Sequence, residues 1–148
     1  MELLLLKQYA ISLLGTAYYF GGDDPMSGFD CSGLACELMR AAGYVPYNFR
    51  TSAQGLADIV RLRGEVKPPQ LGSLSFYGKS YTQIVHVGFC LDDITMIEAG
   101  GGNAETLTDA IASQYNAFVR MRPITFRKDF LFTAYPKYPS HVDEPKVL

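Results

Sequence analysis

The fold of this chain is decided by the stretch Phe29-Asp30-Cys31-Ser32-Gly33-Leu34. Apolar residues follow it at helical spacing as far as Ala42, and Gly43 stands where a helix commonly ends. Asp30 is a residue type that caps helix starts, so Cys31 is predicted to lie in the first turn. There the macrodipole and the unpaired backbone N–H groups favour the thiolate, which is the nucleophilic form of cysteine. The stretch therefore predicts a reactive thiol at a helix start.

A free cysteine is more often simply a small buried residue. We assign that role to Cys36, inside the same helix, and to Cys90, inside a predicted strand. The neighbours of Cys31 are polar or small, which a core position would not favour, and Gly33 is expected to leave room for a substrate backbone. Three cysteines at these spacings form neither a disulfide framework nor a zinc pattern. We therefore expect free thiols, a reducing cytoplasm, and no metal or cofactor.

Composition and charge exclude several functional classes. The chain has 148 residues, 13 basic and 15 acidic, and a net charge of −2 without any block of like charge. Nucleic-acid binding needs a clustered basic face, so it is not expected as the main activity. No apolar run approaches the roughly 20 residues that span a bilayer, and the apolar start lacks the pattern of a signal peptide. We expect one domain over 1–135 and an extended tail over 136–148.

Hydrophobic periodicity predicts helices first and strands second, which is the order of an α+β fold with N-terminal helices packed on an antiparallel sheet. Thr51 and Gln54 have the spacing of a capping box before the third helix. Asp92-Asp93 separates two strands and predicts a tight hairpin. The predicted helices are 3–14, 31–42, 52–62 and 106–115, and the predicted strands are 74–77, 85–91, 95–99 and 118–124.

A nucleophilic thiol needs a base within hydrogen-bond reach, and the sequence has two histidines. His141 lies in the Pro-rich tail and is expected at the surface. His86 lies in a strand whose alternate residues, Val87 and Phe89, are typical of a core face, so its side chain projects from the opposite face. A histidine satisfied inside a core is the alternative, but together with Cys31 the pattern favours a catalytic base.

The group that orients the base is expected on the adjacent strand. Glu98 is the polar member of Met96-Ile97-Glu98-Ala99-Gly100, and the predicted hairpin brings it near His86. A carboxylate there would hold one imidazole nitrogen and favour the imidazolium. The alternative is an exposed strand carboxylate, in which case Asn103 is the reserve candidate.

Two other polar or glycine-rich segments receive a structural interpretation. Asp23 and Asp24 lie in a Gly-Pro loop and are expected to form a solvated turn rather than a cation site. The run Gly100-Gly101-Gly102 is not a phosphate loop, because no lysine or helix start follows at the required spacing.

Four motifs in order resemble the NlpC-type cell-wall peptidases, a papain-like family of cysteine peptidases that cut peptidoglycan stem peptides. They are Gly15-Thr16-Ala17-Tyr18-Tyr19-Phe20-Gly21-Gly22, Phe29-Asp30-Cys31-Ser32-Gly33-Leu34, Leu71-Gly72-Ser73-Leu74-Ser75-Phe76 and His86-Val87-Gly88-Phe89. The resemblance implies that Cys31 is the nucleophile, His86 the base and Glu98 the third polar residue. It also implies that Tyr18, Asp30 and Ser32 belong to the substrate cleft.

The sequence departs from the family pattern at several positions. The third polar residue of the family is most often His, Asn or Gln, whereas here it is Glu98. Phe20 stands where the family usually has Trp, Ala17 where it usually has Pro, and Ser73 where an acidic residue is usual. These differences bear on activity and specificity rather than on the fold.

The resemblance implies a peptidase acting on the γ-D-glutamyl–diamino-acid bond of a stem peptide. A bare catalytic domain of this kind resembles those of tailed phages and phage-like particles, whose tail or particle proteins would then be partners. We expect the chain to be made in the cytoplasm without a signal peptide and to act at the cell wall. Two alternatives stay open: a catalytically idle structural subunit of such a particle, and a thiol-dependent acyltransferase or deamidase.

Overall fold

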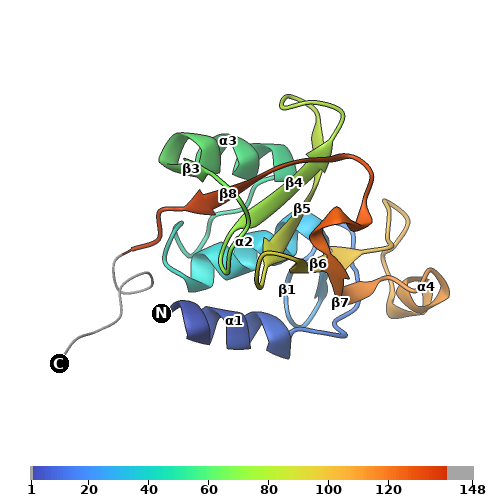
Figure 1. Ribbon diagram of the computed structural model, residues 1–148. Coiled ribbons are helices and arrows are strands. Elements are labelled where there is room, and N and C mark those ends of the chain that lie inside the picture. The colour runs from blue at the N-terminus through green and yellow to red at the C-terminus, as the bar shows by residue number, and fades with distance from the viewer. Residues whose placement is uncertain (1, 140–148) are drawn as a thin grey trace.

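The helix that begins at Cys31 packs on a six-stranded antiparallel sheet in the computed structural model, which describes residues 2–139 (Figure 1). The strand order across the sheet is β3-β8-β4-β5-β6-β7, and a separate hairpin is formed by β1 and β2. The helices are α1 (Leu3–Ser12), α2 (Cys31–Ala41), α3 (Ala53–Arg63) and α4 (Asp109–Gln114), with a 3-10 turn η1 (Ile124–Phe126). The strands are β1 (Asp23–Asp24), β2 (Gly28–Phe29), β3 (Gly64–Val66), β4 (Leu74–Gly78), β5 (Ile84–Cys90), β6 (Thr95–Gly100), β7 (Phe118–Pro123) and β8 (Phe130–Pro136). The predicted α+β class is confirmed.

The main core lies between the helices and one face of the sheet. Leu34 and Leu38 of α2 belong to the same buried cluster as Phe76, Val87 and Phe89 of the central strands. Their alternation along each strand is the period-two pattern expected of a sheet face that packs on helices. Among residues 2–139, no helix has both the length and the apolar character needed to cross a membrane.

The opposite face of the sheet carries a smaller core and several polar side chains, His86 among them. Tyr77, Cys90 and Met96 form this cluster together with Ile124 of η1. Tyr77 pairs with His86 across β4 and β5, so the imidazole lies on this second face. The predicted orientation of β5, with Val87 toward the main core and His86 away from it, is confirmed.

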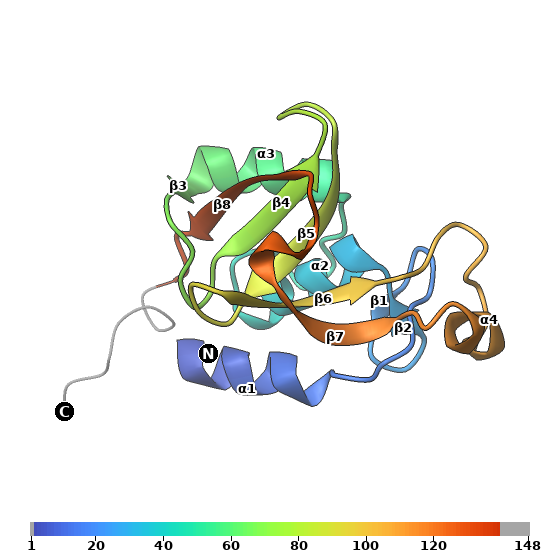
Figure 2. The ribbon, with the colours of Figure 1, turned by 45° about the vertical axis from the view of Figure 1, so that its right-hand side comes forward.

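The predicted hairpin between β5 and β6 is confirmed. Asp92 accepts hydrogen bonds from the backbone N–H groups of Ile94 (2.8 Å) and Thr95 (2.7 Å), which closes the turn. The strands then pair at Phe89↔Ile97 and Cys90↔Met96. Beyond these pairs β6 and β7 diverge in direction from β4 and β5, as Figure 2 shows.

Strand β8 is an element that the sequence analysis does not predict, and it lies inside the sheet between β3 and β4. Phe132 and Ala134 of this strand are buried. The segment predicted as a tail begins at the last residue of β8, and within it Tyr138 is buried and donates a hydrogen bond to the carbonyl oxygen of Gly72 (2.5 Å). Residues 140–148, and with them His141, lie outside the described residues.

The predicted cap of α3 is wrong by one residue. Ser52, not Thr51, has the extended backbone of an N-cap and accepts a hydrogen bond from the N–H of Gly55 (3.1 Å). Gln54 therefore falls one position short of the capping-box glutamine. Its side chain instead accepts from the backbone N–H of Ile84 (2.8 Å), which fastens α3 to the start of β5.

Candidate active site

Cys31 is the first residue of α2, as the sequence predicts. Asp30 caps the helix by accepting a hydrogen bond from the N–H of Gly33 (2.7 Å). The expectation for Gly33 is wrong, because a Cβ there would lie only 1.8 Å from the carbonyl oxygen of Gly22. Glycine is required where the protein's own loop crosses the helix start, and no room for a substrate is left at this point.

His86 lies next to the thiol, although it comes from a distant strand. The Cys31 thiol lies 3.8 Å from the carbonyl oxygen of Val85, the residue before His86, and it is close enough to the imidazole to raise the pKa of His86. The imidazole is 5% exposed and rests against the ring of Tyr77. The structure thus places a thiol at a helix start beside a buried base.

Glu98 completes the group that the sequence predicts. The β5–β6 register, continued, sets His86 opposite Gly100, so Glu98 is its diagonal neighbour on the same face. The Nε2 atom of His86 lies 2.7 Å from Oε1 of Glu98. Glu98 is 2% exposed, so the alternative of an exposed strand carboxylate is wrong. Because Nε2 is engaged, Nδ1 is the imidazole nitrogen left for the thiol.

The charges of the neighbours decide which proton states are favoured. Burial alone would lower the pKa of His86, but hydrogen bonds and charges from Cys31 and Glu98 raise it to about 9. Burial alone would raise the pKa of Glu98, but hydrogen bonds from His86 and Arg120 hold it below its ordinary value. An imidazolium next to a carboxylate is therefore the favoured state at neutral pH.

A cavity of about 190 Å³ opens onto these residues. Tyr18 is one of its lining residues, and burial raises the pKa of this phenol far above the physiological range, so it is a neutral hydroxyl. The cavity is lined by Tyr18, Cys31, Val85, His86, Glu98, Ala99, Gly100, Gly101, Gly102, Arg120, Phe126 and Arg127. Of the predicted cleft residues, the structure thus brings Tyr18 to the cavity.

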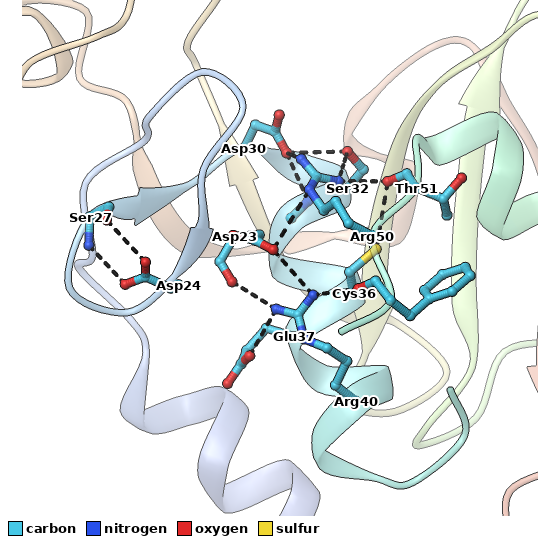
Figure 3. A network of polar contacts seen from close by, with 12 residues as sticks. Asp23, Asp24, Ser27, Asp30, Ser32, Cys36, Glu37, Arg40, Arg50 and Thr51 are labelled. Carbon is cyan, nitrogen blue, oxygen red and sulfur yellow. Dashed lines mark hydrogen bonds and ion pairs between the residues drawn. The ribbon is translucent and has the colours of Figure 1, made fainter. Parts of the chain in front are cut away.

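Asp30 and Ser32 do not line this cavity and belong instead to a polar network beside α2, drawn in Figure 3. Arg50 donates to both, at 3.0 Å from Asp30 Oδ1 and 3.0 Å from Ser32 Oγ. The substrate role predicted for Asp30 and Ser32 stays a prediction, to which the structure adds a role in holding the helix start.

The acidic pair of the β1–β2 hairpin divides between two roles. Asp24 accepts from the N–H groups of Met26 and Ser27 and forms the predicted exposed turn. Asp23 instead accepts from Arg40 at 3.2 Å, which ties the hairpin to α2 (Figure 3). The prediction of a solvated turn therefore holds for Asp24 and is wrong for Asp23.

Replacing Asp30 with asparagine is expected to lower the free energy of unfolding by about 1–3 kcal/mol. The carboxylate receives hydrogen bonds from Gly33 N–H, Gly21 N–H and Arg50, whereas an amide has one acceptor oxygen and turns its NH₂ toward a donor. Urea unfolding measures the change. The matched control is Asp58→Asn on the exposed face of α3, where a change within about 0.5 kcal/mol is expected. Equal stability of the Asp30 variant and wild type would contradict the assigned role.

The remaining candidates lie away from the cavity. Asn103 accepts a hydrogen bond from the N–H of Glu105 (2.9 Å) and shapes its own loop, so the imidazole is not its partner. Cys36 and Cys90 are buried, as predicted, and burial raises the pKa of both thiols. No group of three or more His, Cys, Asp or Glu side chains in the described part of the chain is arranged to hold a metal ion.

Arg120 is the contact of this site that the sequence analysis missed. It faces Glu98 across β6 and β7, and its Nε donates to Oε2 of Glu98 at 3.3 Å. The sequence signal for this contact is the alternating strand Phe118–Pro123, which carries Arg120 and Arg122 on one face. Pairing Arg120 with Glu98 required the register across a connection that contains α4.

Comparison with known proteins identifies the family of the chain. The model of the NlpC/P60 family matches residues 15–128. The chain belongs to the NlpC/P60 family. The matched range contains Cys31, His86 and Glu98 as well as α2 and the strands β4 to β7 that carry this site.

Solved structures of NlpC/P60 proteins have the same papain-like fold. The NlpC/P60 domain of the peptidoglycan hydrolase SagA is 21% identical with a TM-score of 0.64, over 90% of this chain and 97% of that one. The peptidoglycan hydrolase RipB from Mycobacterium tuberculosis is 23% identical with a TM-score of 0.61, over 93% and 67%.

A lipoprotein-like NlpC/P60 protein from Staphylococcus aureus is 21% identical with a TM-score of 0.65, over 90% of this chain and 40% of that one. This chain thus spans about two fifths of the length of that protein. Among curated proteins, none matches this chain. The papain-like fold expected from the sequence is confirmed for this NlpC/P60 member.

Proposed function

We propose that this chain is a cysteine peptidase that hydrolyses an amide bond in peptidoglycan stem peptides. The observation that carries the proposal is the row formed by Cys31, His86 and Glu98, which begins at a helix start and lines one cavity. Membership of the NlpC/P60 family and the peptidoglycan hydrolases among its structural neighbours support this substrate class.

The proposed reaction uses the thiol as nucleophile and the imidazole as proton carrier. The Cys31 thiolate attacks the amide carbonyl, and the backbone N–H of Cys31 at the start of α2 helps to stabilise the oxyanion. The His86 imidazolium protonates the leaving amine, so the C–N bond breaks and a thioester with Cys31 remains. Neutral His86 then takes a proton from water as the water attacks the thioester. The C–S bond breaks, which releases the carboxylic acid and regenerates the Cys31 thiolate and the His86 imidazolium.

Within this reaction Glu98 keeps the imidazole oriented and favours its protonated form. Its Oε1 atom holds Nε2 of His86 at 2.7 Å, so the ring presents Nδ1 to the thiol. The bond that we propose is the amide between γ-D-glutamyl and the diamino acid, as the resemblance of the motifs to NlpC-type peptidases implies.

Digestion of purified peptidoglycan tests both the activity and the bond. The expected products carry a new amine on the diamino acid and a new γ-carboxyl on D-glutamate, which mass spectrometry of the released fragments identifies. New ends at another amide would contradict the proposed bond but support the peptidase. Intact peptidoglycan together with an unreactive Cys31 would contradict the proposed function and favour an idle structural subunit.

A further inference from the structure

Arg120 binds the carboxylate oxygen that His86 leaves free. Glu98 and Arg120 are directly paired in the register of β6 and β7, and Arg120 Nε lies 3.3 Å from Oε2 of Glu98. The other oxygen, Oε1, faces His86. Each oxygen of this buried carboxylate therefore has a cationic donor of its own.

The guanidinium of Arg120 is also anchored from the backbone. Its Nη1 donates to the carbonyl oxygen of Asn116 at 3.0 Å. Asn116 adopts a left-handed conformation (φ 53°), which asparagine tolerates better than most residues. The turn after α4 thus fixes the arginine in the position from which it reaches Glu98.

The glycine run that follows β6 packs directly on this ion pair. A Cβ on Gly100 would lie 2.3 Å from Oε2 of Glu98 and 3.1 Å from Nη2 of Arg120. A Cβ on Gly101 would lie 3.1 Å from the same Nη2 atom. The bare backbone at Gly100 and Gly101 therefore leaves room for the Glu98–Arg120 pair, which accounts for two glycines of a run that is not a phosphate loop.

We propose that Arg120 is a positioning residue of the Cys31–His86–Glu98 site, where it holds Glu98 by its second oxygen and balances the charge of that carboxylate. A thiolate, an imidazolium and a carboxylate together carry one uncompensated negative charge, and burial makes such a charge costly. The neutral third residue usual in the family brings no such charge. This inference rests on the proposed function.

The other charged and titratable groups around the imidazole do not replace Arg120. They are Cys31 on α2, Tyr77 on β4, Glu98 on β6, and Arg127 with Asp129 after η1. Arg127 and Asp129 form a two-bonded ion pair with each other (2.9 and 2.8 Å) and largely cancel. Arg120 is thus the cation matched to Glu98.

Replacing Arg120 with glutamine is expected to raise the titration midpoint of the His86–Glu98 pair by about one pH unit. Loss of a nearby cation favours an added proton, whichever of His86 and Glu98 holds it. Arg120→Lys keeps the charge and is expected to stay close to wild type. Glu98→Gln removes the opposite charge and is expected to move the titration to lower pH.

Two measurements that need no substrate record these shifts. Nuclear magnetic resonance of labelled histidine follows the titration of His86, in a His141→Gln background so that one signal remains. The rate at which iodoacetamide alkylates Cys31 is measured across pH from the peptide that contains this residue. This rate reports the fraction of Cys31 that is thiolate. The matched control is Arg122→Gln, which removes the same charge from the same strand, where the arginine stacks on Phe126 (4.0 Å).

An upward shift in Arg120→Gln, together with its absence in both Arg122→Gln and Arg120→Lys, would support the proposal. Unchanged or lowered midpoints in folded Arg120→Gln would overturn it. If that variant does not fold, Arg120→Met keeps the aliphatic stem and takes its place; unfolding of both would make Arg120 a structural residue and also overturn the proposal. The proposed function fails separately, if Cys31 of the wild type alkylates no faster than a model thiol.

Discussion

Replacing Cys31 with serine is expected to reduce the proposed cleavage of stem peptides at least about a thousandfold. A serine hydroxyl does not form the thiolate–imidazolium pair that His86 and Glu98 support, because its proton is held far more tightly than that of a thiol. The substitution keeps the size of the side chain at the start of α2, so the fold is retained. Mass spectrometry of fragments released from peptidoglycan measures the loss.

The two other cysteines provide matched controls. Cys36 of α2 is buried in the main core and Cys90 in the smaller core on the opposite face of the sheet, and neither lines the cavity. Their alanine variants are expected to lose stability, since each leaves a void, while cleavage per folded molecule stays near the wild-type rate. Wild-type cleavage by Cys31→Ser would rule out the thiol as nucleophile.

Replacing Glu98 with glutamine is expected to narrow the pH range of activity from its alkaline side. The pKa of His86 is raised to about 9 in part by Glu98, so the imidazolium persists well above neutral pH in the wild type. Removing the carboxylate charge lowers the pKa of His86, and the alkaline limb of the pH–rate profile moves to lower pH.

The plateau of the same profile is expected to fall about tenfold or more. An amide offers one oxygen to two donors, His86 Nε2 and Arg120 Nε, so one of them loses its acceptor. Initial rates of peptidoglycan cleavage across pH measure both effects. The control is Glu105→Gln, which changes an exposed carboxylate outside the cavity. A shift of the alkaline limb of equal size in this control would contradict the role assigned to Glu98.

The parts of this site that could be predicted from the sequence are those that depend on local patterns. A cap before an apolar helical stripe locates Cys31, and strand alternation places His86 on the face away from the core. The hairpin at Asp92-Asp93 is short, so its register brings Glu98 within reach of His86 with little ambiguity. Each of these inferences spans a few neighbouring residues or one tight turn.

What the sequence could not supply depends on contacts between distant segments. To predict the contact of Arg120 with Glu98 one must know the β6–β7 register. The loop and α4 between these strands make that register impossible to infer from the sequence. The network of Arg50 with Asp30 joins a loop to a helix start, and no periodic pattern marks it. Strand β8 was not predicted for the same reason, since strand order in a sheet is set by tertiary packing rather than by order along the chain.

The position of β8 also constrains how the protein is made. β8 pairs with β3 on one side and with β4 on the other, and both partners precede it along the chain. While a ribosome is still translating the codons before Phe130, β3 has no neighbour and the edge of β4 is open to foreign strands. Completion of the sheet therefore waits for one of the later segments to emerge, and until then the open strand edges favour aggregation over folding.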